Sequence, residues 1–167
     1  MDLFDAIRSR ASVRSLEPVE VPDADLEAIL DAGRRAPSGM NAQPLQYLVV
    51  RDRAAIETLA KVQGFIGGAS VIVFIVADPA ASTYWLEDAA AAAENMLLAI
   101  VAQGYASTWV EGTLLRREDW AKELLAVPDH LRLIIALPIG RAAAPPEQAP
   151  KNPLDDIVHY ETFGQRG

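Results

Sequence analysis

Cysteine is absent from the 167 residues of this chain, and histidine occurs only twice. The chain can therefore form no disulfide, thiolate nucleophile or cysteine metal site, and it fits a reducing compartment, so we expect a cytoplasmic protein. His130 and His159 lie outside any H-E-x-x-H motif, so we do not expect a zinc hydrolase. We expect a structural or solvent-exposed role for both, and no metal site.

Long apolar runs and an excess of positive charge are also missing. No apolar stretch approaches the ~20 residues that cross a bilayer. The first residues, MDLFDAIRSR, lack the apolar segment of a signal peptide. The net charge of −8 argues against binding to nucleic-acid phosphates, which requires clustered bases. We therefore expect neither a membrane nor a nucleic acid as partner.

Three common catalytic and nucleotide-binding motifs are absent as well. The chain has no G-x-x-x-x-G-K-[ST] loop and no G-x-S-x-G turn, and its glycine cluster GFIGGAS has the wrong spacing for a dinucleotide fingerprint. P-loop phosphate binding and serine hydrolase chemistry are therefore not expected.

The apolar patterns that are present predict one α+β domain over residues 1–167. Helical spacing covers 3–10, a segment from Pro22 to near Gly33, 53–66, 84–104 and 117–127, and strand-like patterns cover 46–50, 70–78, 106–110 and 131–140. We expect an α/β sandwich in which helices flank a mixed central sheet. The strand at 70–78 should be covered on both faces, and the apolar helix at 84–104, about 30 Å long, should form the core or a subunit interface. The tail carries enough apolar residues that we expect it to dock.

The stretch RASVR places Arg10, Ser12 and Arg14 at alternate positions. In extended chain such residues share one face, so two guanidinium groups and a hydroxyl can point at one anion. The same spacing also fits a solvated basic turn, and the residues alone favour that simpler interpretation.

Two polar loops accompany this stretch. APSGMNAQP, at 36–44, sets Ser38, Asn41 and Gln43 between two prolines, and STWVEG, at 107–112, ends an expected strand in Glu111-Gly112. A glycine at such a position lets a backbone amide approach a planar ligand closely. Taken singly, each loop fits an ordinary turn.

Taken together and in this order, the three stretches resemble the nitroreductase family of FMN-dependent oxidoreductases. The resemblance runs nearly end to end, through RSRASVRSL, APSGMNAQP, the long alanine-rich helix, STWVEG, LIIALPIG and the tail PKNPLDDIVHYETF. It implies a homodimer with FMN sites at the subunit interface, NAD(P)H as the co-substrate, and a flavin that supplies the chemistry, so that no catalytic side chain is expected.

The resemblance also implies which residues bind the cofactor. Arg10 and Ser12 would hold the FMN phosphate, with Ala11 between them, and Arg14 would reach the ribityl chain or the pyrimidine edge of the flavin. The other subunit would contribute the polar loop, and the flavin would lie along the end of STWVEG, with a backbone amide near N5. Lys151 would complete the phosphate site from the tail. The cofactor-binding residues expected from APSGMNAQP and STWVEG are Pro37, Ser38, Asn41, Gln43, Trp109, Val110, Glu111 and Gly112.

Some positions depart from the family pattern. Ala11 and Asn152 stand where relatives often carry a base, Lys151 replaces a common arginine, and Leu45 stands where an aromatic residue is usual. The phosphate pocket would therefore carry fewer charges than is typical.

The expected activity is reduction of nitroaromatic or quinone-type acceptors in a ping-pong cycle. The alternatives are an FMN-holding storage or sensor protein without turnover, and a flavin enzyme of the same fold that removes halogen or fragments flavin. The last type usually needs a lid, for which only residues 64–68 and 78–86 are candidates.

Overall fold

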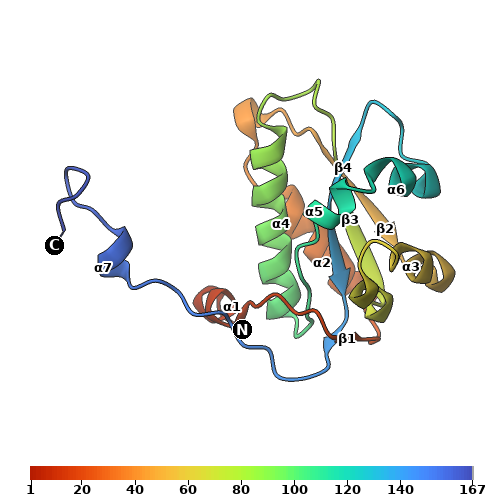
Figure 1. Cartoon of the computed structure of the whole chain (residues 1–167), viewed down its shortest axis with the longest axis horizontal. Helices are drawn as coiled ribbons and strands as arrows, with labels where there is room; N and C mark the ends of the chain where they lie inside the picture. The colour runs from red at the N-terminus through yellow and green to blue at the C-terminus, as the bar shows by residue number, and fades with distance from the viewer. Residues whose placement is uncertain (167) are drawn as a thin grey trace.

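The computed structural model describes residues 1–166 and arranges them around a three-stranded sheet (Figure 1). In chain order, the elements are α1 (Leu3–Ser9), β1 (Leu16–Glu17), α2 (Asp23–Arg34), η1 (Gly39–Asn41), β2 (Leu45–Val50), α3 (Arg53–Leu59), η2 (Gly64–Gly68), β3 (Val71–Ala77), α4 (Trp85–Ala102), α5 (Gly112–Leu115), α6 (Glu118–Leu125), β4 (Arg132–Ile139), β5 (Arg141–Ala142) and α7 (Leu154–Ile157).

Strand β3 forms the centre of the sheet, with β2 and β4 on either side. All seven of its residues are buried. Ile72 and Phe74 belong to the core on one face, whereas Val73 and Ile75 belong to the core on the other, as the alternation of a strand requires. The predicted α+β sandwich, with a strand covered on both faces, is therefore confirmed. The described strands pair antiparallel throughout, so the sheet is not mixed in direction.

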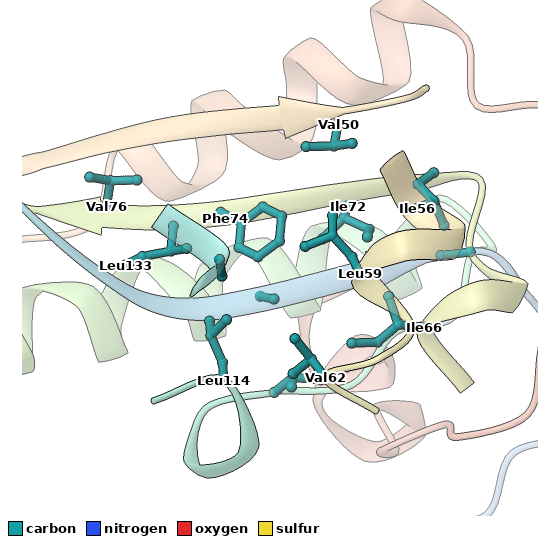
Figure 2. Packing of buried hydrophobic residues seen from close by; sticks show 14 of the residues in the cluster. Val50, Ile56, Leu59, Val62, Ile66, Ile72, Phe74, Val76, Leu114 and Leu133 are labelled. Atoms are coloured by element: carbon teal, nitrogen blue, oxygen red, sulfur yellow. The ribbon is translucent and has the colours of Figure 1, made fainter. Parts of the chain in front are cut away.

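Different helices cover the two faces. Figure 2 shows the first face, where Ile56 and Leu59 of α3 and Leu114 of α5 pack with Phe74. Helices α2 and α4 cover the other face. They approach closely, because a Cβ atom at Gly33 of α2 would lie 2.1 Å from Cε of Met96 in α4. The long apolar helix is thus a core helix, as predicted.

The predicted helix at 53–66 is shorter in the structure. Asp52 caps its start by accepting a bond from the Ala55 amide (2.8 Å), but α3 ends at Leu59 and a separate turn, η2, covers 64–68. Glycine lowers helix stability by about 1 kcal/mol relative to alanine, and Gly64, Gly67 and Gly68 fall within a few residues. The apolar spacing continued beyond the point at which the backbone could remain helical.

The predicted strand at 106–110 is also incomplete. Ala106 pairs with Gly140 and Val110 with Ala136, but only as isolated bridges. Counting inward from both bridges places Pro138 opposite Thr108, and proline has no N–H to donate to a ladder. The segment therefore follows the edge of β4 without forming a regular strand.

The end of the tail does not dock on its own chain, so the predicted docking would need another surface. Leu154, Tyr160 and Phe163 are 71%, 55% and 93% exposed, and Figure 1 shows the tail extending away from the sheet. Among the described residues, no helix is both long and apolar enough to span a membrane.

Candidate functional site

Residues 10–14 run as an extended segment after α1. Ala11 and Val13 turn inward, with Ala11 only 7% exposed, whereas Ser12 and Arg14 are exposed and Arg10 is partly buried. The three polar side chains of RASVR therefore share the outer face. Ala11 can meet a ligand only through its backbone.

The charges of this segment are only partly compensated. Arg10 Nε lies 3.7 Å from Oε1 of Glu94 on α4, which is a loose pair. Across residues 1–166, Arg14 and Lys151 form no ion pair. Arg14 and Lys151 are thus available to bind an anion, in addition to Arg10.

The second predicted stretch lies directly against the first. The Val13 amide donates to the Ser107 carbonyl (3.0 Å), so RASVR and STWVEG run side by side. Val110 is buried and tied to β4, whereas the Trp109 indole N–H donates to Oε2 of Glu111 (2.8 Å). This bond fixes the Glu111 carboxylate beside the indole and leaves the following backbone exposed.

Gly112 begins α5 at the surface. A Cβ built there would have one neighbour within 4 Å, Nη1 of Arg116 at 4.0 Å. Packing within the chain therefore does not require glycine at this position. The open space above its Cα fits the close approach of a flat ligand to the backbone.

The proline-rich tail passes the same segment. The Gln148 side-chain amide donates to the carbonyls of Ile7 (3.1 Å) and Arg10 (2.9 Å). Lys151 is three residues further along, which is a reach of at most about 11 Å. The structure thus places Gln148 against the residues before Ala11, and the role of Lys151 stays a prediction.

The polar loop at 36–44 has an unusual backbone. Met40, Asn41 and Gln43 have φ values of 54°, 56° and 50°, in the left-handed region that residues other than glycine rarely adopt. Ser38 Oγ accepts a bond from the Gln43 amide (3.1 Å), which closes the loop on itself. The side chains of Pro37, Asn41 and Gln43 are exposed.

A small pocket of about 80 Å³ lies on the inner side of this loop. Its lining includes Pro37, Ser38, Gln43 and the phenol of Tyr47. Burial raises the pKa of Tyr47 to about 12, so its hydroxyl stays protonated and can only act as a neutral hydrogen-bonding group near neutral pH.

The loop and RASVR occupy different ends of α4. The Gly39 amide donates to Oδ1 of Asp88, near the N-terminus of α4, whereas α1 and the segment after it lie toward the other end (Figure 1). Across residues 1–166, no hydrogen bond or ion pair joins the loop to residues 10–14. One chain therefore places RASVR beside STWVEG and passes Gln148 of the tail along RASVR, but it keeps the loop toward the other end of α4.

The sequence analysis missed three polar residues around these stretches. Glu94 lies beside Arg10, Asp88 holds the loop, and Gln63 Oε1 accepts a bond from the hydroxyl of Thr113 (3.1 Å), next to Gly112. The partner of each lies about 50 residues or more away in the sequence, so spacing carried no signal for it. In the part of the chain that the structure describes, no group of His, Asp or Glu residues could hold a metal ion.

Comparison with known proteins gives a consistent result. The sequence profile described as "Nitroreductase family" matches residues 7–63 and 57–141. A protein of Archaeoglobus fulgidus, provisionally named NADH dehydrogenase/NAD(P)H nitroreductase, is 34% identical over 143 residues, which cover 80% of this chain and 82% of that protein. An iodotyrosine deiodinase of Thermotoga neapolitana is 29% identical over 189 residues, which cover 96% of this chain and 98% of that protein. The crystal structure of a provisionally named nitroreductase from Desulfovibrio desulfuricans, in complex with FMN, has a TM-score of 0.86 at 30% identity and covers 98% of both chains.

Proposed function

The chain belongs to the nitroreductase family, and from that premise we propose that it is an FMN-dependent NAD(P)H oxidoreductase that reduces nitroaromatic or quinone-type acceptors. The observation that carries the proposal is the bond from the Val13 amide to the Ser107 carbonyl, which aligns two segments of the predicted site. The crystal structure of the Desulfovibrio desulfuricans relative with FMN supports this choice of cofactor, and a structure of the same fold, a Vibrio harveyi NADPH:FMN oxidoreductase, has been solved with NAD⁺. The lack of cysteine is in keeping with a cytoplasmic location.

The residues at this place suit the phosphate end of FMN. Arg10, Ser12 and Arg14 face outward together, and Lys151 follows on the tail that Gln148 holds against the Arg10 carbonyl. Arginine offers a planar pair of donors to a phosphate, and bonds between charged groups are about twice as strong as neutral ones. Arg10, Lys151 and the Ser12 hydroxyl can satisfy a phosphate dianion even though Ala11 and Asn152 add no charge.

The isoalloxazine would lie along Trp109–Gly112, where the open space at Gly112 allows backbone contact. When bound, FMN would supply the hydride chemistry that links NAD(P)H to the acceptor, for which we propose a ping-pong order. The chain's own part is to bind and orient. The amide near Gly112 would donate to the flavin, and Arg14 would place positive charge at its pyrimidine edge, where negative charge develops on reduction.

A second copy of the chain would supply the polar loop. Within one chain the loop and RASVR lie toward different ends of α4, so Ser38, Asn41 and Gln43 can join the site only from a partner. The exposed apolar residues Leu3 and Phe4 of α1, at 62% and 66%, give a second reason to expect an interface. We therefore include a homodimer with two shared FMN sites in the proposal.

The test is a spectrum of the purified protein. Visible flavin absorbance that bleaches with NADH or NADPH and returns on addition of a quinone supports the proposal. Colourless protein that takes up no added FMN would refute it. Yellow protein that does not oxidise either nicotinamide would instead identify an FMN-holding module without turnover.

A same-fold dehalogenase is the second candidate, because a relative covered to 98% is named an iodotyrosine deiodinase. The two lid candidates argue against it. In η2, Ile66 is buried in the core, and residues 78–84 are tied through Ser82 to Asp88. Release of iodide from iodotyrosine by the reduced protein would favour the dehalogenase over simple acceptor reduction.

A further inference from the structure

Asp88 is a buried carboxylate at the start of α4. It is the fourth residue of the helix and only 4% exposed. Its Oδ1 accepts from the Gly39 amide (2.8 Å), and its Oδ2 accepts from the Ser82 hydroxyl (3.2 Å). Ser82 is itself 8% exposed, and its oxygen accepts from the Tyr84 amide (3.0 Å).

The charge of Asp88 is held without a cation. Among the ion pairs formed by residues 1–166, none involves Asp88. Burial of a carboxylate is costly unless hydrogen bonds and local dipoles replace its water. Here the replacement is the loop amide, one hydroxyl and the positive end of a long helix. The adjacent Glu87 is exposed, so an acid in this turn can interact favourably with the N-terminus of the helix without being buried.

The partner of Asp88 is the loop residue with the least freedom. A Cβ at Gly39 would lie 2.3 Å from Cδ2 and 2.9 Å from Cβ of Tyr84, so only glycine fits between the Tyr84 ring and the carboxylate. The bond from Gly39 to Asp88 spans 49 residues of sequence. It is therefore a tertiary anchor, not a local turn.

The residues after Gly39 need such an anchor. Met40, Asn41 and Gln43 all have positive φ, and this conformation is unfavourable unless the surroundings impose it. Met40 is 95% exposed, so its own side chain gains no packing within the chain. Apart from the Ser38–Gln43 closure, the Gly39–Asp88 bond is the hydrogen bond by which η1 is fixed to the helix.

We propose that Asp88 is a positioning residue for FMN binding: through the Gly39 amide and Ser82, it holds the loop 36–44 in the conformation that presents Ser38, Asn41 and Gln43 to the flavin. This inference rests on the proposed function, because that function identifies FMN as the ligand of the anchored loop. A loop that is already ordered loses less conformational freedom when a ligand binds, so the anchor raises affinity without touching the ligand.

The test compares Asp88→Ala, Asp88→Asn and the control Glu87→Ala. Hydrogen exchange of the apoprotein reports on loop order, and titration of the apoprotein with FMN reports on affinity. We expect Asp88→Ala to speed exchange of the Gly39–Asn41 amides and to weaken FMN binding by roughly tenfold or more. Asp88→Asn keeps an acceptor oxygen for Gly39 and should recover most of the affinity, while Glu87→Ala should match the wild type.

Rescue by asparagine separates positioning from bulk stability. The proposal is overturned if Asp88→Ala binds FMN as tightly as the wild type, or if its loop amides exchange at the wild-type rate. If Asp88→Ala does not fold, Ser82→Ala, which removes one hydroxyl, must show the same effects in smaller degree, and unchanged exchange and affinity there overturn it.

Failure of the proposed function would look different. Wild-type protein that binds no FMN would refute the function, while loop exchange in the variants would still show whether Asp88 orders the loop. Wild-type protein that binds FMN alongside an Asp88→Ala variant that binds it equally well would refute the positioning role alone.

Discussion

The ion pair between Glu118 of α6 and Arg132 of β4 gives the most quantitative prediction. The Glu118 carboxylate accepts from Nε (2.8 Å) and Nη2 (2.9 Å) of Arg132 and from the Leu133 amide (2.9 Å). The guanidinium also lies 5.4 Å from the ring centroid of Trp85, the first residue of α4. The pair therefore joins a helix on one face of the sheet to the turn from which Asp88 projects.

The perturbation is Glu118→Ala. The Arg132 side chain is 40% exposed, so water can solvate it once Glu118 is removed. Loss of the ion pair should therefore lower the free energy of unfolding by only ~0–1 kcal/mol, as for a surface pair. The Leu133 amide has no such route because Leu133 is fully buried, and an unpaired buried donor costs about 1–3 kcal/mol. We expect a loss of about 3 kcal/mol in the free energy of unfolding, which corresponds to roughly 6–12 °C in Tm for a chain of this size.

The assay is urea and thermal unfolding followed by circular dichroism, at one fixed protein concentration because a dimer's stability depends on it. Asp119→Ala is the matched control, since Asp119 is the next acid in the same helical turn and is exposed. A loss below about 1 kcal/mol, or one no larger than that of the control, would refute the reasoning.

The same carboxylate should give a signature in acid. Burial alone would raise the pKa of Glu118, but the bonds from Arg132 and the Leu133 amide outweigh it and lower the pKa below its usual 4.5. The folded state therefore favours the ionised form. Its contribution to stability is complete above the unfolded pKa and is lost as the pH falls through the lower, folded one. Glu118→Gln should flatten this acid limb in unfolding curves measured across that range.

Three further predictions concern the cofactor, the assembly and the tyrosines. Arg10→Ala should weaken FMN binding by roughly tenfold or more, because it removes a charge-assisted bond, whereas Arg8→Ala, on the exposed side of α1, should not; full flavin retention by Arg10→Ala after gel filtration would contradict the phosphate role. Sedimentation of the FMN-loaded protein should give two copies of the 18.0 kDa chain, and a monomer with tightly bound FMN would rule out the shared site. Burial raises the pKa of Tyr47 to about 12, and the hydrogen bond to Asp25 raises that of Tyr105 to about 12, so both should ionise later than ordinary phenols in an absorbance titration. Since the fold favours their neutral forms, any stability they add persists below the usual pKa of 10 and fades as the pH rises toward 12, and Tyr47→Phe should remove one late step.

Elements with strong local rules were the ones that could be predicted. Asp2 caps α1 through the Asp5 amide (2.9 Å), and α4 stops just before Gly104, whose φ is 86°, as its sequence indicated. The strand at 71–77 was recognisable because β-branched residues buried on both faces leave a continuous apolar run. Periodicity, caps and terminating glycines act within a few residues, so the sequence displays them directly.

Features that depend on distant partners could not be predicted. The gap opposite Pro138 appears only once that residue is placed beside Thr108, and Asp88 looks like any acid in the first turn of a helix until Gly39 is brought to it. The motifs assign RASVR and STWVEG to one site, and the bond from Val13 to Ser107 places the two segments side by side, while their binding roles stay predictions. That the loop at 36–44 would come from the other subunit was implied only by the family resemblance, because no local pattern shows that α4 separates the loop from RASVR within one chain.

The gap at Pro138 also bears on motion. The Thr108 region is attached to β4 by one pair of bonds at Ala106 and another at Val110, with none required between them. Such a segment can shift without breaking the bonds of β3 to β4, since the missing N–H of Pro138 faces away from β3. The pair of bonds at Val110 ties the proposed flavin wall, Trp109–Gly112, to β4, so the residues between the two pairs can adjust while the wall stays attached to the sheet.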